Sequence, residues 1–570
     1  MNKDAYGWCW SQKGRKPLGH MVAAFVCICF SVGMAKGEER SDTPNPSPQS
    51  EQLEPSRAET ERLPWTTIKV REIRVTGSTV FSEMELAEVT RPYVARGELT
   101  AEDLDELRVA LTRFYVDRGY VTSGAVLPAQ TVTDGILTFE IIEGTLTRIE
   151  VDNNKWFREG YIRKRLARGA QTPVNIQSLQ QRLLLLEQDP RIERLKVELR
   201  PEEERGKSYL YAQVHETFPF YVALTFDNYQ SSTVGAERGL ISLAHRNVTG
   251  HGDILSVTYG RSEGVSILLD AGYTLPLNAY DTTVGLRYRR DNSVLVERPF
   301  ADLDIESESE VFSLTLWQPL YRTLTQEFAV LFEGERLQNQ TRLLDDPFDF
   351  TAGSEDGETV DTALRLTLEW RNQTQTQVVA IRSRFSLGID ALGATINDAP
   401  DVPDGRFFAW LGQFQWLRRV NVFSVREAQL LFRLTVQLAN DPLLPLEQMA
   451  VGGRFTVRGY HENQLVRDNG LTLSLESRIP LFRDKPWADV VELAPFFDFG
   501  HAYNTAQPTP DLKTIYSIGI GLRWALSFPK PVPWRSRFEI YWGHALVDVD
   551  NDGGGLQDKG IHLQFVLDTL

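Results

Sequence analysis

The sequence predicts a membrane β-barrel of sixteen antiparallel strands over residues 218–570, preceded by two small α+β domains over residues 67–145 and 146–217. Three observations support this fold class. Apolar and polar side chains alternate with a period of two in the C-terminal region, its connections are alternately short and long, and residues 67–217 carry one order of predicted elements twice. Alternation is expected of strands with one face toward lipid and the other toward a wet interior.

The composition of the chain excludes other classes. Its 570 residues include 61 Lys and Arg against 77 Asp and Glu, a net charge of −16, so the basic footprint of a nucleic-acid-binding protein is missing. The sequence has no uncharged apolar run of the ~18 residues that a membrane-spanning helix needs, which excludes a polytopic helical membrane protein. Barrel strands mix polar and apolar residues, so a hydrophobic content of 42% is compatible with them.

The N-terminus predicts an exported protein. Basic residues at positions 13, 15 and 16 precede an apolar stretch, 21–35, that ends in small residues and is too short to span a bilayer. We interpret residues 1–35 as a secretory signal peptide rather than an uncleaved membrane anchor. The cysteines of the sequence all lie within this segment (Cys9, Cys27 and Cys29). We therefore expect a processed chain with neither a disulfide nor a thiolate metal site.

Residues 36–66 are predicted to form a linker. They are polar and punctuated by proline at positions 44, 46, 48, 55 and 64, and such a composition cannot bury a core. Helix-forming residues dominate between Ser50 and Leu63, so a short helix is also compatible with this stretch.

The two α+β domains each follow the order strand, helix, helix, strand, strand. In the first domain the predicted elements are a strand at 69–75, helices at 82–93 and 100–118, and strands at 122–128 and 135–142. In the second they are a strand at 147–151, helices at 158–168 and 176–188, and strands at 192–199 and 208–215. The helix from Thr100 opens with a capping box, and its apolar positions have the spacing of one buried face: Leu104, Leu107, Leu111 and Tyr115. Generic small α+β modules are the alternative for this stretch.

Sixteen alternating segments are expected to cross the membrane. They begin near residues 220, 239, 253, 265, 282, 311, 326, 361, 378, 406, 428, 470, 491, 515, 535 and 560. The count is even, as closure of an antiparallel barrel requires.

The connections between these segments fall into two classes. Those after even-numbered strands are short and often contain proline: 275–277, 318–320, 479–481 and 528–529. Those after odd-numbered strands are longer and acidic, for example 292–310, 337–360 and 440–469. Short turns face the periplasm in outer-membrane barrels, which places the two N-terminal domains there. A soluble β-sandwich, the alternative, lacks this rhythm of loop lengths.

Two short motifs suggest a family. The connection after strand eleven contains Val457, Arg458, Gly459 and Tyr460, and strand thirteen contains Phe496, Asp498 and Gly500 at F-x-D-x-G spacing. They resemble the VRGY loop motif and the FxDxG strand motif of the Omp85 superfamily. With two domains that resemble POTRA domains and a proline-rich linker, residues 50–570 resemble a TpsB transporter of two-partner secretion, in the haemolysin-activator branch.

The resemblance implies that the loop folds back into the lumen and that Arg458 meets Asp498. Asp498 lies between Phe497 and Phe499, so it faces the lumen if those rings face lipid. Breaking a desolvated pair costs roughly 3–5 kcal/mol, but a wet lumen is expected to reduce that to about 1 kcal/mol. The pair either gates secretion or only holds the shape of the barrel. The resemblance also suggests that a helix within residues 37–64 plugs the pore.

The function implied by the resemblance is secretion of a partner protein across the outer membrane. An unfolded TpsA-like exoprotein would dock on the POTRA domains by adding a strand to an exposed sheet edge, with 122–127 and 208–214 as candidate edges, and would then thread the barrel. Three alternatives remain: an Omp85-type insertase, which usually carries more POTRA domains; a passive porin, which would not need them; and a barrel-anchored enzyme.

Patterns that resemble catalytic or metal motifs do not fit their contexts. Gly260–Gly264 matches G-x-S-x-G, but Ser262 is expected at a hairpin tip rather than at a strand-to-helix turn. The acidic segment 548–553 begins like a calcium loop, yet Lys559 occupies the twelfth position, where a glutamate is required. The sequence contains no phosphate-binding GxxxxGK[ST] motif. We therefore expect no catalytic residue, metal, cofactor, nucleotide or nucleic acid, and outer-membrane lipid as the surroundings.

Overall fold

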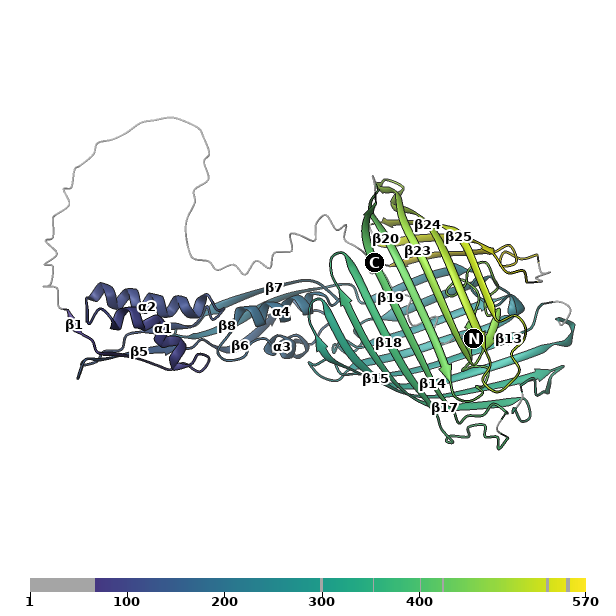
Figure 1. Cartoon of the computed structure of the whole chain (residues 1–570), viewed down its shortest axis with the longest axis horizontal. Coiled ribbons are helices and arrows are strands. Elements are labelled where there is room, and N and C mark those ends of the chain that lie inside the picture. The colour runs from purple at the N-terminus through teal and green to yellow at the C-terminus, as the bar shows by residue number, and fades with distance from the viewer. Residues whose placement is uncertain are drawn as a thin grey trace, which may run out of the picture. The chain divides into compact units, whose positions relative to one another are not determined.

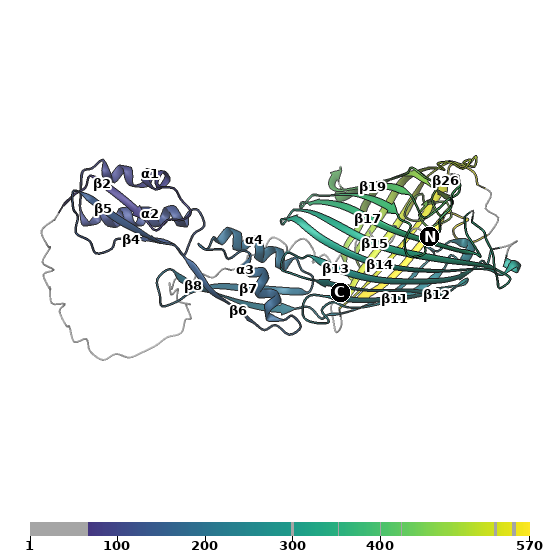
Figure 2. The ribbon, with the colours of Figure 1, turned by 90° about the horizontal axis from the view of Figure 1, so that it is seen from below.

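The computed structural model describes residues 67–569 except 298–300, 352, 400, 423–424, 529–532 and 550–553. These residues form two compact units, an N-terminal unit of two α+β domains and a barrel from Thr217 onward that also takes in Lys155–Tyr161. Figure 1 and Figure 2 show both from two directions. The predicted signal peptide (1–35) and the linker with its plug helix (36–66) lie outside the described residues. Among the residues described, no helix is long and apolar enough to cross a membrane.

The first α+β domain has a three-stranded sheet covered by two helices. Its elements are β1 (Ile68–Lys69), β2 (Glu72–Thr76), α1 (Glu83–Val94), β3 (Glu98–Leu99), α2 (Ala101–Val116), β4 (Gly124–Val126) and β5 (Ile136–Ile142). The sheet order is β2-β5-β4, with β5 parallel to β2 and antiparallel to β4. The predicted capping box at Thr100 and Asp103 is present, and the predicted apolar face of α2 is buried.

The second α+β domain repeats this topology. It contains β6 (Thr145–Asp152), α3 (Glu159–Ala167), α4 (Ile176–Glu187), β7 (Ile192–Pro201) and β8 (Lys207–Glu216), with sheet order β6-β8-β7. The last strand is central because it lies parallel to β6 and closes a hairpin with β7. The prediction of 208–214 as an exposed edge was therefore wrong, and the edges of this sheet are β6 and β7. In the first domain, β4 is an edge, as predicted for 122–127.

The two domains of this unit are joined by hydrogen bonds to backbone carbonyls. Asn175 caps α4 by accepting from Gln177 N and Ser178 N, and its amide nitrogen donates to the Arg118 carbonyl over 3.1 Å. The next residue, Ile176, donates its N–H to the Gly119 carbonyl over 2.9 Å. The start of α4 is thus fixed to the end of the preceding domain's second helix.

Sixteen long strands of the described chain form the barrel. They are β9 (Phe220–Asp227), β10 (Arg238–His245), β11 (Ile254–Ser262), β12 (Val265–Pro276), β13 (Thr283–Val294), β14 (Ile305–Arg322), β15 (Gln326–Leu343), β17 (Glu358–Gln373), β18 (Gln377–Gly388), β19 (Phe408–Val422), β20 (Val425–Ala439), β23 (Asn469–Lys485), β24 (Ala488–Tyr503), β25 (Thr514–Phe528), β26 (Trp534–Ala545) and β27 (Ile561–Thr569). Each strand pairs antiparallel with the next. The ring closes where β27 pairs with β9, from Gln564↔Asp227 to Asp568↔Ala223. A two-residue strand, β16 (Asp346–Pro347), pairs with the end of β15. The predicted fold class is confirmed.

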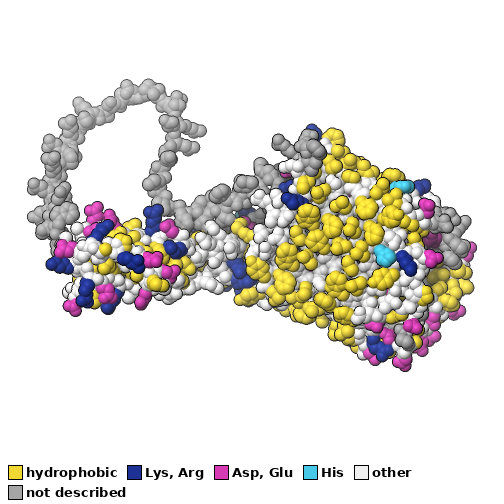
Figure 3. Space-filling model, viewed as in Figure 1, with side chains coloured by type: hydrophobic (Ala, Val, Ile, Leu, Met, Phe, Trp, Pro, Cys, Tyr) yellow, Lys and Arg dark blue, Asp and Glu magenta, His cyan; other side chains and the backbone are white. Residues whose placement is uncertain are grey.

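The alternation along these strands separates an apolar outer face from a charged lumen. On β17, Leu364 is 51% exposed whereas its neighbour Arg365 is buried, and on β26, Trp542 is 51% exposed whereas Tyr541 is buried. Figure 3 shows hydrophobic side chains spread over the visible outer face of the barrel. Such an apolar outer face is typical of a barrel that faces lipid, where exposure does not cost the free energy that it would cost in water.

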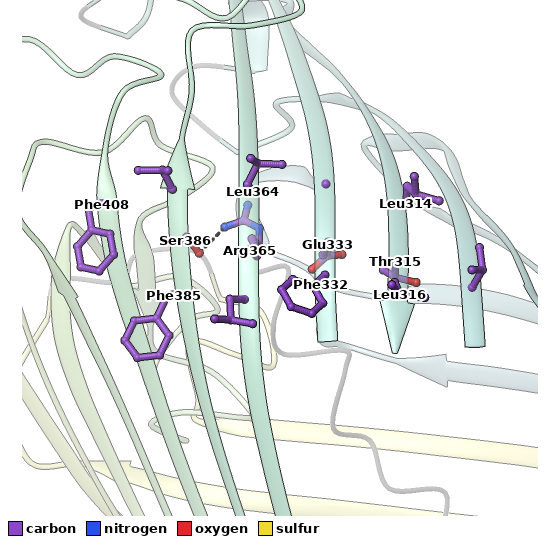
Figure 4. A pocket seen from close by; sticks show the side chains of 14 residues that line it. Leu314, Thr315, Leu316, Phe332, Glu333, Leu364, Arg365, Phe385, Ser386 and Phe408 are labelled. Atoms are coloured by element: carbon purple, nitrogen blue, oxygen red, sulfur yellow. Dashed lines mark hydrogen bonds between the residues drawn. The ribbon is translucent and has the colours of Figure 1, made fainter. Parts of the chain in front are cut away.

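A shallow hollow of about 690 Å³ lies on this outer face. It forms where Gly334 of β15 stands between Leu314 and Leu364 in the cross-strand register, because the glycine leaves a gap in a row of leucines. Figure 4 shows its outward leucine and phenylalanine side chains. The hollow belongs to the outer surface of the barrel and not to the lumen.

Two prolines predicted in turns lie instead inside strands. Pro319 is in β14 and Pro480 is in β23, and the pairing register shifts directly after each of them. A proline lacks the N–H that a sheet ladder needs, so it is tolerated at a bulge. The turns themselves follow a few residues later, before β15 and β24.

Candidate functional site: the loop between β20 and β23

The connection 440–468 folds into the barrel lumen. Its middle is buried, with Val457, Arg458 and Tyr460 each 0% exposed. Its side chains meet residues on the inner faces of β23, β24 and β26. We call residues 440–468 the lumen loop.

A short hairpin gives the lumen loop its shape. Strands β21 (Met449–Val451) and β22 (Leu465–Arg467) pair antiparallel. Val451, Val457, Tyr460 and Leu465 pack in one apolar cluster with Ala502 and Ile515 of the barrel wall. The loop is therefore a folded element with its own core, held against the wall from β24 to β25.

Arg458 donates five hydrogen bonds inside the lumen. Its Nε donates to Asp498 Oδ2 over 2.7 Å, its Nη2 donates to Asp498 Oδ1 over 2.9 Å, and its backbone N–H donates to Oδ2 over 3.1 Å. Nη1 donates to Glu476 of β23, and Nη2 also reaches Ser474 Oγ at 3.2 Å. This two-pronged pairing with a carboxylate needs the planar fork of arginine, which lysine cannot reproduce.

Each residue of the strand motif either contacts Arg458 or leaves room for the lumen loop. The Phe496 ring lies under the guanidinium, with Arg458 Cζ 3.5 Å from its centroid. Asp498 accepts the hydrogen bonds, and Gly500 leaves room for the loop because a Cβ there would lie 2.3 Å from Val451 Cγ1 and 2.8 Å from Val457 Cγ2. Their alternate spacing on β24 places all of them on one inward face.

The other residues of the loop motif make backbone contacts. Gly459 has φ +95°, a conformation that side chains with a Cβ rarely adopt, and its N–H donates to His562 Nε2 over 3.2 Å. The Tyr460 hydroxyl donates to the carbonyls of Tyr516 at 3.0 Å or Val547 at 3.2 Å, and it accepts from Val547 N at 3.1 Å. The motif is thus bound along its whole length.

The pair is dry, which corrects the expectation of a wet lumen. Arg458 and Asp498 are both 0% exposed, because Phe496, Tyr541 and the loop itself cover them. The discount to about 1 kcal/mol does not apply, and removal of one partner falls in the range of about 3–5 kcal/mol for a broken buried pair.

Further charged residues, which sequence reasoning missed, complete the site. Arg454 of the lumen loop donates to Glu539 of β26 over 2.8 Å, and Arg523 of β25 donates to the same carboxylate over 3.0 Å. Glu476 is equally buried beside Arg458. Their alternation places Glu476 and Glu539 on lumen faces, but many lumen residues are charged, and nothing in the sequence selects the ones that meet the loop.

One loop carboxyl has an altered acidity. Burial raises the pKa of Glu462 to about 8, although a hydrogen bond from Arg454 N at 2.6 Å opposes the shift. Its neighbour His461 bonds to Asp558 through Nε2 and to Ser232 Oγ through Nδ1. The loop tip therefore bonds to two other loops, η1 (Ser232–Val234) and the segment before β27.

The patterns dismissed as catalytic lie in ordinary surroundings. Ser262 is the last residue of β11 and its hydroxyl donates to the Val234 carbonyl over 2.9 Å, so it stands at a hairpin tip as predicted. Within the described residues, the carboxylates grouped closely enough to hold a metal ion are Asp304, Glu306 and Asp345. They are outside the lumen loop, and exposed acids of this kind are common without a metal.

Two α+β domains before a closed barrel, with a long loop folded into its lumen, define an outer-membrane protein with periplasmic POTRA domains. The chain belongs to the haemolysin secretion/activation protein family ShlB/FhaC/HecB, whose model matches residues 206–524. A model of the ShlB-type POTRA domain matches residues 68–144.

Characterised relatives are distant but cover most of the chain. The outer membrane transporter CdiB of Dickeya dadantii is 23% identical over 488 residues, 82% of this chain and 82% of that protein. CdiB of Escherichia coli O6:K15:H31 is 25% identical over 469 residues, 80% and 76% of the two chains. The heme/hemopexin transporter protein HuxB of Haemophilus influenzae is 20% identical over 477 residues, 77% and 78%.

Solved structures share the fold. CdiB from Escherichia coli superposes with a TM-score of 0.64 at 20% identity, over 91% of this chain and 92% of that one. CdiB from Acinetobacter baumannii gives 0.59 at 17% identity, over 88% and 90%. BamA from Haemophilus ducreyi, lacking POTRA domains 1–3, gives 0.52 at 13% identity, over 88% and 99%, a likeness of fold alone.

The family assignment settles the function class. The chain is an outer-membrane transporter of two-partner secretion, with its POTRA domains in the periplasm, and it acts with a secreted exoprotein partner. The alternative of a BamA-like insertase is disfavoured, because the family match and the curated relatives are transporters.

Proposed function

We propose that the Arg458–Asp498 pair is a lock that holds the lumen loop in place at rest and is released while the partner passes. The observation that carries this proposal is the burial of both charges together with the donation of three Arg458 N–H groups to one carboxylate. A folded loop inside the lumen reduces the space open to an extended polypeptide, so we expect transport to require the loop to move. The work is done by docking, release and threading, without a catalytic step.

The test compares Arg458→Ala with the wild-type protein. Secreted partner and total partner are quantified in the same cultures, and heat-modifiable migration on gels establishes that the barrel is folded. We expect a folded barrel with secretion changed at least several-fold. Normal secretion by a folded Arg458→Ala barrel would contradict the lock.

The partner is proposed to be a TpsA-like exoprotein that arrives unfolded in the periplasm. Its recognition by strand addition is favoured at a long edge, because main-chain hydrogen bonds supply the affinity. The edge strand β7 is ten residues long, whereas the edge strands β6 and β4 have eight and three. We propose β7 as the principal docking edge.

A photo-crosslinking residue distinguishes this edge from the centre of the same sheet. Lys196 of β7 and Gln213 of β8 are direct cross-strand neighbours. A crosslinker in place of Lys196 is expected to capture the partner in the periplasm, and one in place of Gln213 is expected to capture much less. Equal capture from both positions would point to a face of the sheet rather than its edge.

The partner is identified by deletion of the gene for this chain. The secreted and outer-membrane proteomes are then compared with those of the parent strain. We expect one large exoprotein to disappear from outside the cell, with other outer-membrane barrels unchanged. General loss of barrels would indicate an insertase.

A further inference from the structure

The lumen loop is also bound to a different part of the barrel wall, near its beginning. The guanidinium of Arg365 on β17 donates through Nη2 to Glu447 Oε1 over 2.9 Å and through Nη1 to Oε2 over 3.0 Å. The two side chains are 3% and 8% exposed. This contact is as well formed as the pair at Arg458, and no sequence motif marks it.

The position of Arg365 is fixed by the wall. It also donates to Glu335 of β15 over 3.0 Å and to Ser386 of β18 over 2.8 Å, and Figure 4 shows the bond to Ser386. Three adjacent strands therefore orient the guanidinium before the loop arrives.

The position of Glu447 is fixed by the base of the loop. Its N–H donates to the Leu444 carbonyl over 2.8 Å, and its own carbonyl accepts from Gln437 Nε2 of β20 over 2.9 Å. Leu443 packs into an apolar cluster with Ala363 and Phe407. Glu447 thus stands at the end of a tight turn whose apolar residues are seated on the wall.

The two contacts have opposite polarity and lie far apart on the barrel. At Arg458 the loop supplies the cation and the wall supplies the acid, whereas at Glu447 the loop supplies the acid. Strands β17 and β24 are five positions apart in the sheet order, which is roughly 24 Å along the wall at ~4.8 Å per strand. The lumen loop is therefore bound to the wall at two separate places, to β17 through Glu447 and to β24 through Arg458.

We infer that Glu447 and Arg365 form a second lock, and that the lumen loop opens fully only when both locks are released. This inference rests on the proposed role of the Arg458–Asp498 pair and adds a positioning pair to it. With Arg458 released alone, the loop stays tied to β17 and swings about its base.

A different effect of Glu447→Gln is expected if Arg365 has a purely structural role. If Arg365 serves only to join β15, β17 and β18, then Glu447→Gln leaves its bonds to Glu335 and Ser386 intact and has no effect on the loop. If the pair is a lock, Glu447→Gln frees the base of the loop. Glu447→Asp, which keeps the negative charge on a side chain one carbon shorter, is the conservative variant and is expected to preserve part of the attraction.

The test measures the accessibility of the loop base on whole cells. Leu444, which is 3% exposed, is replaced by cysteine in a full-length chain in which Cys9, Cys27 and Cys29 are serine. Labelling by a membrane-impermeant maleimide is timed for the wild-type pair, Glu447→Gln, Glu447→Asp and Arg458→Ala. Asp270→Asn is the matched control, because Asp270 pairs with Arg287 on the neighbouring wall strand, at 2.9 Å, away from the lumen loop.

We expect labelling at least tenfold faster in Glu447→Gln, a rate closer to that of the wild type in Glu447→Asp, and no change in Asp270→Asn. Heat-modifiable migration must show a folded barrel in every variant. A wild-type rate in Glu447→Gln, or a Glu447→Asp rate equal to that of Glu447→Gln, overturns the second lock. Partner secretion by Arg458→Ala, measured in the same strains, tests the first lock separately, so failure of one proposal is distinguishable from failure of the other.

Discussion

Gly459 of the lumen loop and Gly543 of β26 lie backbone to backbone. A Cβ on Gly459 would fall 2.9 Å from the carbonyl carbon and oxygen of Gly543, and a Cβ on Gly543 would fall 2.7 Å from Gly459 N. Such distances are available only when neither residue has a side chain. The position of the VRGY segment thus depends on a glycine of the barrel wall as much as on the residues of the motif.

Gly543→Ala is expected to displace the loop without unfolding the barrel. The added methyl group meets backbone atoms, which cannot rotate away, and overpacking of this kind costs about 1–3 kcal/mol. Limited proteolysis between residues 440 and 468 measures the displacement. Gly334→Ala is the control, because its Cβ would lie 3.8 Å from Leu364 on the outer face. Equal protection of the loop in both variants would contradict the close fit.

Asp498→Asn is expected to lower the free energy of unfolding by about 3–5 kcal/mol, since the buried Arg458 loses its bidentate partner and keeps Glu476. Thermal unfolding in detergent, followed by heat-modifiable migration, measures the loss. Asp270→Asn removes a partly exposed pair and is expected to cost at most about 1 kcal/mol. Similar losses in the two variants would mean that the lumen pair is hydrated.

The binding of the lumen loop to the barrel wall is expected to weaken as the pH rises toward about 8. The folded pKa of Glu462, about 8, lies above its ordinary value of 4.5, so the neutral carboxyl stabilises the loop at low pH and this contribution is lost as the group ionises. Arg454, Arg238 and Asp227 are the charged groups nearby. At each pH between 6 and 9, the rate of maleimide labelling of Leu444→Cys is divided by the rate in the same chain with Glu462→Gln, because ionisation of the thiol itself accelerates labelling in both. We expect this ratio to rise with pH toward about 8, and a ratio that does not change with pH would assign the effect to another group.

Tyr460→Phe is expected to loosen the loop tip. Its hydroxyl accepts from Val547 N over 3.1 Å, and loss of this bond from a partly buried N–H is expected to cost about 1 kcal/mol. Proteolysis of the loop is the readout. Tyr259→Phe, on the outer face at 43% exposure, serves as the control and is expected to leave the loop protected. Full protection in Tyr460→Phe would show that water replaces the hydroxyl.

The fold could be predicted from the sequence because its signals are local. A period of two in Leu286, Tyr288 and their neighbours identifies a strand and its two faces, and the long and short connections give the strand order. Local signals also placed the capping box at Thr100. They failed at Pro319 and Pro480, where the bulge that tolerates a proline depends on the pairing strand.

Only part of the candidate site could be predicted from the sequence. The motifs pointed to Arg458 and Asp498, yet the burial of the pair depends on the approach of Tyr541 from another strand. Glu447 and Arg365 are 82 residues apart. The alternation of side chains along a strand predicts which face a charged residue occupies, but it does not predict which loop contacts that residue. The central position of β8 was missed for a related reason, because the order of strands in a sheet is set by the helical crossover.

The requirement for loop movement is tested by tethering the lumen loop in its closed position. The side chains of Ser232 in η1 and His461 in the loop lie 3.1 Å apart, Oγ to Nδ1, and neither residue belongs to the two proposed locks. Ser232→Cys with His461→Cys, in the chain without native cysteines, therefore permits a tether through a short bifunctional thiol reagent with a reducible linker, and partner secretion is measured before and after reduction. We expect secretion to stop while the tether is intact and to resume on reduction. Undiminished secretion through a folded, fully tethered barrel would contradict the claim that the lumen loop must move.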